Sequence, residues 1–340
     1  MTYNNKKLKG AIIGFGRIAE EKHYPAFLGS NTAEIVAASD ISEKRRGWLK
    51  EKYPTMQVTE NYTELFERKD LDFIDIACPP YAHMEIAISA IKKNLPIICE
   101  KPIAISTEET EKISEAIVKH KILFYPVHTY KRAFAAKRIK EIIDDNIIGQ
   151  ITEIGIKILR NNPRIGVSDW IPDWRTKKQY AGGGALMDYG PHIFSLIHYW
   201  LGDNVNLEII KAQITHDRDA DKNSVEKEIA AYLNAGETKL SLAISFASPK
   251  SEFIYTLAGT KGHLHYANGT GKMLISTPAN SYEEFHTPIT FPSHPNWFKE
   301  LLSEFSANLK SGEYLTNELR EKYKSYFLFQ NKNGNLNSIF

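Results

Sequence analysis

The sequence has little cysteine, no long apolar run and almost no excess charge of either sign. Cys78 and Cys99 are the only cysteines among 340 residues, and both lie in short apolar segments, which is typical of buried thiols rather than of a disulfide framework. Lys and Arg number 43 and Asp and Glu number 41, so the net charge is +2 and the basic excess that nucleic-acid binding requires is missing. No apolar run approaches the length of a transmembrane helix, and residues 1–13 lack the pattern of a signal peptide. We therefore expect a cytoplasmic protein that binds neither nucleic acid nor a membrane.

Several catalytic motifs are also missing. No Cys-x-x-Cys or His-Glu-x-x-His spacing occurs, so the sequence predicts no metal site. No serine lies in a Gly-x-Ser-x-Gly segment, which removes the most common hydrolase signature. The chain also lacks internal repeats, low-complexity segments and a Pro/Gly-rich linker. Its domain organisation is therefore inferred from hydrophobic periodicity.

The first 127 residues alternate short apolar runs with amphipathic segments, in a chain whose 340 residues are typical of two domains. Apolar runs without alternation predict strands buried on both faces, so we expect a parallel sheet covered by helices. The pattern predicts an α/β fold with a doubly wound Rossmann domain over residues 1–127. The expected strands are 11–14, 34–40, 72–78, 95–100 and 122–127, and the expected helices are 42–52, 83–93 and 107–120.

The periodicity changes after about residue 131. Several segments alternate apolar and polar residues, which is the pattern of strands with one buried and one free face. The turn Ala235-Gly236-Glu237 joins two of them as a hairpin. We predict that residues 128–340 form an α+β domain with a large, mainly antiparallel open sheet. The alternating segments are 150–159, 225–233, 239–246 and 252–257, and helices are expected at 133–146, 296–309 and 318–329.

The segment Gly14-Phe15-Gly16-Arg17-Ile18-Ala19 follows the first predicted strand and begins a helix. In a dinucleotide-binding loop the first glycine permits a tight turn and the second lets the backbone approach the pyrophosphate. The third position needs a small side chain, which Ala19 provides. The helix N-terminus then offers N–H groups to the phosphates. A Gly-x-Gly-x-x-Ala pattern alone is weak evidence, but its strand–turn–helix context predicts a bound dinucleotide.

Asp40 ends the second predicted strand. A carboxylate at this position accepts hydrogen bonds from an adenosine ribose and repels a 2′-phosphate, so it favours NAD. Lys44, Arg45 and Arg46 follow closely and could hold a 2′-phosphate instead. We prefer to interpret these three residues as a solvated helix face, and we predict NAD as the cofactor with NADP as the alternative.

Two further segments carry residues suited to catalysis. Lys101 follows the predicted strand 95–100, and ligands of such sheets bind beyond the carboxyl ends of the strands. A cation there would stabilise negative charge on an alkoxide. In the glycine-rich segment 182–192, Asp188 and His192 share one face of a helix, where a carboxylate can orient an imidazole as a proton acceptor. Taken singly, a strand-end lysine is usually a surface charge and such an Asp–His pair only a local hydrogen bond.

These segments occur together in the order found in one family. Residues 14–19, 77–83, 100–102, Trp174-Arg175 and 182–192 resemble the motifs of the Gfo/Idh/MocA oxidoreductases, and the resemblance extends from about residue 8 to about residue 309. The resemblance implies that Lys101, Asp188 and His192 form the catalytic set. It also implies that the open sheet of the second domain is an oligomer interface, so we expect a homodimer or a homotetramer.

The resemblance and the motif positions together give the expected binding residues. Cofactor contacts are expected from Gly14, Phe15, Gly16, Arg17, Ile18, Asp40, Pro79, His83, Glu100 and Lys101. Substrate contacts are expected from Tyr130, Arg160, Trp174 and Arg175. The chain departs from many relatives at Ser195, where an aspartate is common, and at 129–132, where an Asn or Gln often precedes the arginine. Both departures concern the substrate pocket and leave the substrate open.

The reaction expected from this set is the reversible oxidation of a secondary alcohol on a sugar or polyol ring. His192 would remove the hydroxyl proton, Asp188 would orient His192, and Lys101 would stabilise the alkoxide. The arginines in 160–175 either recognise a phosphate or carboxylate of the substrate or form ion pairs. Two other functions stay open: an NAD-dependent glycosidase that uses a transient oxidation, and a non-catalytic regulator that senses the cofactor. The intact catalytic set counts against the regulator.

Overall fold

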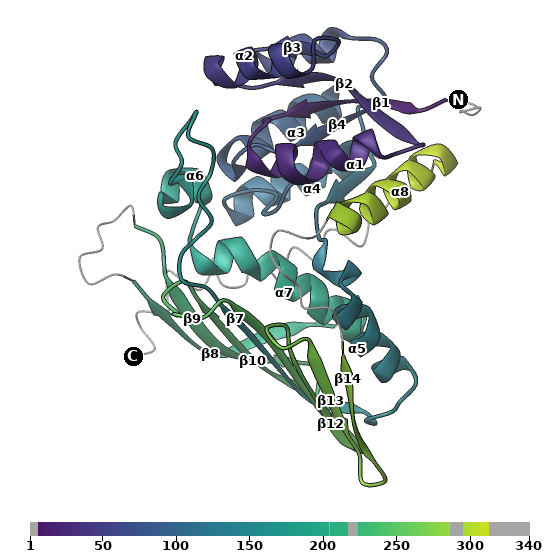
Figure 1. Ribbon diagram of the computed structural model, residues 1–340, viewed down its shortest axis with the longest axis vertical. Helices are drawn as coiled ribbons and strands as arrows, with labels where there is room; N and C mark the ends of the chain where they lie inside the picture. Colours follow the sequence, from purple (N-terminus) through teal and green to yellow (C-terminus); the bar gives the residue numbers. More distant parts are fainter. Residues whose placement is uncertain (1–5, 204, 217–223, 286–294, 313–340) are drawn as a thin grey trace.

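The computed structural model of the protein describes residues 6–203, 205–216, 224–285 and 295–312 and contains two sheets (Figure 1). The first sheet has six parallel strands in the order β3-β2-β1-β4-β5-β6. Strand order reverses between β1 and β4, the point at which such sheets bind dinucleotides. The predicted Rossmann fold is confirmed. Its strands are β1 (Leu8–Ile13), β2 (Ala33–Ser39), β3 (Gln57–Thr59), β4 (Phe73–Ile76), β5 (Ile97–Cys99) and β6 (Phe124–Pro126).

Both faces of the first sheet are covered by helices. Ile12 and Ile13, adjacent on β1, lie in two different core clusters, one on each face. The helix α4 shows why these segments are helical: the Ser106 hydroxyl caps its N-terminus, and Ile113 and Ile117, one turn apart, form its buried face. The helical segments of this half are the π-helical η1 (Ala19–His23), α1 (Tyr24–Leu28), α2 (Glu43–Lys52), η2 (Tyr62–Glu67), η3 (Pro80–Ala82), α3 (His83–Lys92) and α4 (Thr107–His120).

The second sheet has eight strands in the order β14-β13-β12-β11-β7-β10-β9-β8. Neighbouring strands are antiparallel except β7 and β10, which pair in parallel. Alternation along β7 buries Ile154, Ile156 and Ile158 on one face. The predicted mainly antiparallel sheet is confirmed. Its strands are β7 (Ile151–Leu159), β8 (Leu207–Thr215), β9 (Glu228–Ala235), β10 (Thr238–Ser245), β11 (Glu252–Gly259), β12 (Gly262–Ala267), β13 (Lys272–Ser276) and β14 (Ser281–Phe285).

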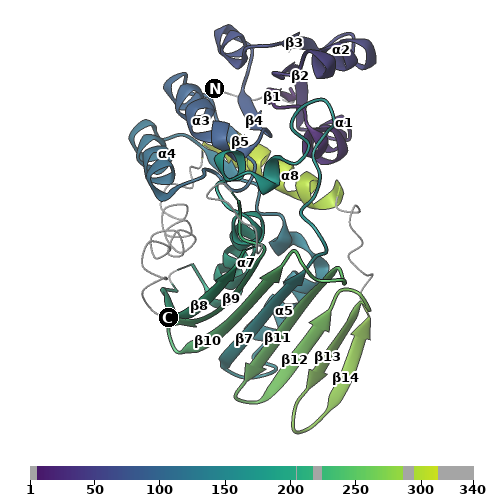
Figure 2. The same ribbon diagram turned by 90° about the vertical axis from the view of Figure 1, so that its left-hand side faces the viewer.

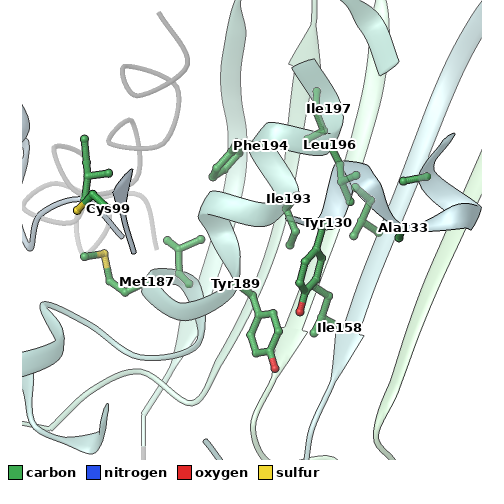
Figure 3. Close-up of a cluster of buried hydrophobic side chains, with 14 of the residues drawn as sticks. Cys99, Tyr130, Ala133, Ile158, Met187, Tyr189, Ile193, Phe194, Leu196 and Ile197 are labelled. Atoms are coloured by element: carbon green, nitrogen blue, oxygen red, sulfur yellow. The ribbon is translucent and has the colours of Figure 1, made fainter. Parts of the chain in front are cut away.

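One face of the second sheet is covered by α5 (Phe134–Asp144) and α7 (Ala185–Leu201) (Figure 2). The two helices are joined by a hydrogen bond of 3.0 Å from Trp200 Nε1 to the carbonyl oxygen of Ala136. Figure 3 shows α7 between Cys99 of the first sheet and Ile158 of the second, so this helix belongs to the core that unites the two halves. The short elements beside it are η4 (Tyr130–Arg132), η5 (Trp174–Thr176) and α6 (Lys178–Ala181).

The last described helix, α8 (Pro295–Ser311), returns to the first sheet (Figure 1). Phe298 and Phe305 of α8 lie in the same core cluster as Phe73 of β4. The ring of Phe305 is 5.3 Å from that of Phe73 and 5.6 Å from that of Tyr125. The helix predicted at 296–309 therefore exists, but it packs on the N-terminal sheet. The helix predicted at 318–329 lies outside the described residues, and the division of the chain at residue 127 stays a prediction.

Two expectations from composition can be compared with the structure. Cys78 and Cys99 are both free thiols, as expected, but only Cys99 of β5 is fully buried, whereas Cys78 is half-buried beside the cavity. Within the described ranges, no helix combines the length and the apolar character needed to cross a membrane.

The contact between α8 and the first sheet gives a test of stability. Phe305 is fully buried, so Phe305→Ala should lower the free energy of unfolding by about 3–5 kcal/mol, the usual cost of removing a buried aromatic ring. Urea unfolding followed by fluorescence measures this change. Phe134→Ala is the control, because Phe134 is 63% exposed and its loss should cost less than about 0.5 kcal/mol. Equal stability of the two variants would mean that α8 does not stabilise the sheet.

Candidate active site

A cavity of about 430 Å³ lies at the carboxyl ends of the parallel strands. One wall comes from the loops after β1, β2, β4 and β5, which contribute Gly14, Asp40, Pro79 and Lys101. The other wall comes from the second domain, chiefly from α7 and from residues 160–177. The cavity therefore occupies the place where sheets of this kind bind their ligands.

The loop after β1 fits a dinucleotide. Gly14 has a φ of +85°, and a Cβ built on it would lie 2.5 Å from the Cβ of Cys78, so only glycine is accommodated. A Cβ built on Gly16 would meet no heavy atom within 4 Å, so its backbone faces open space in the cavity. Ala19 is fully buried, as the small third position requires. The loop thus has room for a pyrophosphate close to its backbone.

Asp40, directly after β2, holds this loop in place through hydrogen bonds. Its Oδ2 accepts a hydrogen bond from the Phe15 N–H and its Oδ1 accepts one from the Ser42 N–H, each at 2.8 Å. Burial raises the pKa of Asp40, while the two N–H groups favour its charged form. The side chain lines the cavity, where a carboxylate would oppose a 2′-phosphate. A preference for NAD over NADP stays a prediction.

The interpretation of 44–46 as a solvated helix face is wrong for Arg45. Its side chain is buried and forms ion pairs with Glu20 and Asp169, each at 2.8 Å. Arg46 pairs with Glu60 at 2.9 Å. Because two carboxylates engage Arg45, its guanidinium stabilises the protein itself rather than facing solvent. Asp169 lies far along the chain, so no local pattern could have indicated this partner.

Residues 160–177, here called the strap, connect β7 to the glycine-rich segment and reach the first domain (Figure 1). Strap residues Gly166, Val167 and Trp170 line the cavity, so a ligand there is enclosed between the strap and the phosphate loop. The contacts that hold the strap on the first domain are Ser42 Oγ to Asp169 O (3.0 Å), Arg17 Nη1 to Ile165 O (3.3 Å), the ion pairs Arg45–Asp169 and Arg164–Glu21, and the stacked rings of Tyr81 and Trp170 (6.1 Å).

Lys101 and Asp188 meet inside the cavity. Lys101 Nζ lies 2.6 Å from Asp188 Oδ1 and also donates to the Asp188 carbonyl oxygen at 2.8 Å. Lys101 follows β5 and Asp188 lies in the first turn of α7, so this ion pair joins the two halves of the molecule. Burial alone would raise the pKa of Asp188, but the charges of Lys101 and Arg175 outweigh burial and lower it. The Asp188 carboxyl is therefore ionised at neutral pH.

His192 lies one turn further along α7 and also lines the cavity. Its ring stacks on Tyr130, with 3.8 Å between the centroids and 6° between the planes. The Asp188 carboxylate binds Lys101 through Oδ1, and the expected orientation of His192 by Asp188 stays a prediction. Helical spacing places Asp188 and His192 on one face, and the Tyr130 ring lies parallel to the His192 ring.

The predicted substrate residues surround this centre. Arg160 Nε donates to the Tyr189 hydroxyl at 2.9 Å, and burial raises the pKa of Tyr189 to about 12, so this hydroxyl stays protonated. The guanidinium of Arg175 lies over the Trp174 ring at 4.1 Å, and burial lowers the pKa of Arg175. In Figure 3 the hydroxyl groups of Tyr130 and Tyr189 point to the same side. The four residues predicted to contact substrate all line the cavity: Tyr130, Arg160, Trp174 and Arg175.

Phe15 and His83 are predicted cofactor residues that do not line the cavity. Phe15 is fully buried and packs on Tyr24 with 5.4 Å between the rings. His83 is also fully buried, and its two ring nitrogens each lie 2.8 Å from a carbonyl oxygen, that of Cys78 or that of Pro102. Both residues therefore support the cavity from behind. Ser195 lies outside the lining as well, whereas Thr129 and Tyr130 of the segment 129–132 belong to it. The remaining predicted cofactor residues line the cavity: Gly14, Gly16, Arg17, Ile18, Asp40, Pro79, Glu100 and Lys101.

A buried charged network beside the cavity was missed by the sequence analysis. His23 is 1% exposed, with Nδ1 2.9 Å from Asp75 Oδ2 and Nε2 3.1 Å from Glu100 Oε1. Burial lowers the pKa of His23, but the two carboxylates outweigh burial and raise it to about 9. The signal in the sequence is Asp75, a charged residue inside the apolar strand β4, because a buried carboxylate needs a partner.

A Rossmann sheet whose phosphate loop opens into a cavity with Lys101 and His192 is the arrangement of a nicotinamide-dependent oxidoreductase. The family model described as oxidoreductase family, NAD-binding Rossmann fold, matches residues 8–128, and the model described as GFO/IDH/MocA C-terminal domain matches residues 136–265. The chain belongs to the Gfo/Idh/MocA family and is an NAD(P)-dependent oxidoreductase.

Named relatives and solved structures agree with this family. The chain is 25% identical to oxidoreductase P35 of Formosa agariphila over 79% of this chain and 82% of that protein. It is 29% identical to D-glucoside 3-dehydrogenase of Escherichia coli over 57% of this chain, a match that spans only 54% of the relative. A crystal structure of a 3-ketoreductase from Actinomadura kijaniata, in complex with TDP-benzene and NADP, has the same fold, with a TM-score of 0.81, 19% identity and coverage of 97% of this chain and 98% of that one.

The strap contacts predict slow release of a bound nucleotide. Asp169→Ala removes the ion pair with Arg45, a charge-assisted contact worth about 1.5–3 kcal/mol, so release of NAD should become about tenfold faster or more. Stopped-flow fluorescence during displacement by excess nucleotide measures the rate. Asp173→Ala is the control, because Asp173 also lies on the strap but pairs with Lys177 of the strap itself. Equal release rates from both variants would show that the strap does not retain the cofactor.

The buried network predicts a pH-dependent contribution to stability. The pKa of His23 rises from about 6.5 in the unfolded chain to about 9, so its stabilisation is complete below about pH 6.5 and is lost as the pH rises through about 9. The groups that face its ring are Asp75 of β4, Glu100 after β5 and the uncharged Phe298 of α8.

Unfolding by urea at a series of pH values tests whether the stabilisation from His23 decreases as the pH rises. The free energy of unfolding of the wild type, compared with that of His23→Leu/Asp75→Leu, should fall by an amount on the order of 3 kcal/mol between pH 6.5 and pH 9. A difference that stayed constant or grew across this range would contradict a charged His23.

Proposed function

We propose that the protein transfers a hydride reversibly between NAD and a secondary ring hydroxyl of a sugar, a polyol or a sugar derivative. The observation that carries the proposal is the Lys101–Asp188 ion pair in the same cavity as the phosphate loop and the His192 ring. A proton acceptor, a fixed cation and a dinucleotide loop in one enclosed space are what alcohol oxidation requires.

Three residues of the chain have separate roles in this reaction. Nicotinamide, when bound, supplies the hydride acceptor. His192 accepts the hydroxyl proton, and the stacked Tyr130 ring keeps its imidazole in one plane. Lys101 donates a hydrogen bond to the substrate oxygen as negative charge develops on it. Asp188 holds the Lys101 ammonium in place within the cavity, in addition to the role toward His192 expected from sequence.

For the substrate, we propose oxidation at carbon 3 of a hexose ring as the first activity to test. The names D-glucoside 3-dehydrogenase and 3-ketoreductase both specify this position in proteins that resemble the chain. Arg160 and Arg175 offer donors to ring hydroxyls or to an anionic substituent, and Trp174 offers an apolar face for the ring. We also propose that the protein is cytoplasmic and forms a homodimer or homotetramer through the second sheet, where Tyr232 is 61% exposed.

Loss of the proton acceptor should abolish most of the activity. His192→Ala should lower kcat about a hundredfold to ten-thousandfold, the usual contribution of a positioned general base. NADH formation at 340 nm, together with detection of the keto sugar by mass spectrometry, measures this on a panel of glucosides, sugar phosphates, inositols and nucleotide sugars. His120→Ala is the control, because His120 is an exposed histidine at the end of α4, away from the cavity and from the second sheet. Wild-type rates in both His192→Ala and Lys101→Ala would refute the proposal.

Nucleotide released from the denatured, freshly purified protein separates the remaining alternatives. Near-stoichiometric NAD would direct the assays first to closed redox cycles, including NAD-dependent glycosidic cleavage. An empty protein would favour a dehydrogenase that exchanges cofactor in each turnover. Nucleotide binding without turnover of any compound in the panel would support the regulator instead.

A further inference from the structure

Lys101 lies in a short segment, Glu100-Lys101-Pro102, whose flanking residues are held by two buried histidines. His23 contacts the Glu100 side chain at 3.1 Å, and His83 contacts the Pro102 carbonyl oxygen at 2.8 Å. His23 is 1% exposed and His83 is fully buried. The flanks of Lys101 are therefore tied to the interior of the first domain.

The Glu100 carboxylate connects His23 to the backbone of Lys101. One of its carboxylate oxygens faces His23, and the other, Oε2, accepts a hydrogen bond of 2.9 Å from the Lys101 backbone N–H. A continuous series of contacts thus runs from Asp75 through His23 and Glu100 to the backbone of Lys101. The Lys101 ammonium at the other end binds Asp188, so the residue is fixed at both its backbone and its charged group.

Both ring nitrogens of His23 face carboxyl oxygens. When Asp75 and Glu100 are ionised, these oxygens only accept, so both nitrogens donate and the ring is an imidazolium. The imidazolium lies between the two carboxylates, and the charge of Lys101 also acts on Glu100. Such an arrangement is directional, because losing either contact leaves a buried charge without its partner.

Two further elements hold His23 in place. It ends the π-helical turn η1, a rare conformation that often occurs at functional sites. Phe298 of α8 stacks on its ring, with 3.8 Å between centroids and 15° between planes. The described C-terminal helix therefore covers the network from the side opposite the sheet.

We propose that His23 is a positioning residue for Lys101, acting through Glu100 and held by Asp75. The proposal rests on the proposed function, in which Lys101 donates a hydrogen bond to the reacting oxygen of the substrate. Without His23, the Glu100 carboxylate turns away from its place, the Lys101 backbone loses its fixed acceptor, and the ammonium no longer points consistently into the cavity.

The test measures the placement of Lys101 without any substrate. His23→Gln and the wild type are acetylated under limiting reagent, and the modification of each lysine is followed by peptide mass spectrometry. Lys101 should react about fivefold faster or more in His23→Gln, because its side chain is only 15% exposed while the ion pair with Asp188 holds. The exposed Lys250 is the internal reference and should react equally in both proteins.

A matched variant separates positioning from general loosening. Asp75→Asn removes a charge from the same buried network but keeps a side-chain oxygen that can accept from His23 Nδ1, so the ring stays against Glu100 and Lys101 should react at nearly the wild-type rate. Unchanged Lys101 reactivity in folded His23→Gln, or equal acceleration in Asp75→Asn, would overturn the proposal. If His23→Gln does not fold, His23→Leu/Asp75→Leu takes its place, because apolar residues often replace a buried ion pair without loss of stability.

Turnover then gives the second readout. His23→Gln should lower kcat about tenfold, measured at saturating NAD so that any change in cofactor affinity does not enter the comparison. If Lys101 reacts faster in His23→Gln but the wild type oxidises no sugar, the proposed function is refuted and the positioning role stands. Wild-type kcat in a folded His23→Gln protein would refute the positioning role alone.

Discussion

The ion pair between Lys101 and Asp188 is the contact on which the active-site geometry depends. The two residues come from different halves of the molecule, the end of β5 and the first turn of α7, and meet at 2.6 Å with side chains only 15% and 19% exposed. Removing one partner of such a pair leaves a buried charge, so the pair fixes the distance between the sheet that carries the phosphate loop and the helix that carries His192.

Two other contacts between segments far apart in sequence enclose the same cavity. Asp169 of the strap reaches Arg45 on the first domain, and Phe298 of α8 covers His23 beside the Glu-Lys-Pro segment. Movement of the strap away from the first domain breaks only a few polar and aromatic contacts, whereas the packing of α8 is part of a hydrophobic core and is expected to persist. The polar strap is therefore the part of the enclosure suited to opening, and α8 is the part suited to keeping the site rigid.

Features that depend on neighbouring residues could be predicted from the sequence, and contacts with a distant partner could not. Strand periodicity was sufficient for both sheets, and the phosphate loop was evident because its glycine spacing and its strand–turn–helix context are contiguous. Helical spacing places Asp188 and His192 on one face, but it gives no sign that Asp188 also binds Lys101 from the first sheet. Arg45 was misjudged because its burial depends on Asp169, and nothing near 296–309 indicates that this helix packs on the first sheet.

Asp75 shows how such a network can be found from sequence and why it is more than a stabilising feature. A carboxylate within the apolar strand Phe73–Ile76 has to be paired, and the only uncertainty is which cation pairs with it. Stability alone is a poor reason for the pair, because apolar side chains of similar volume usually stabilise a core as well or better. A buried imidazolium between two carboxylates forms directional hydrogen bonds, which fix the orientation of these side chains in a way that apolar packing does not. One of those carboxylates, that of Glu100, binds the backbone N–H of Lys101. The fixed orientation of Glu100 therefore also fixes the backbone of the residue that we place at the reacting oxygen.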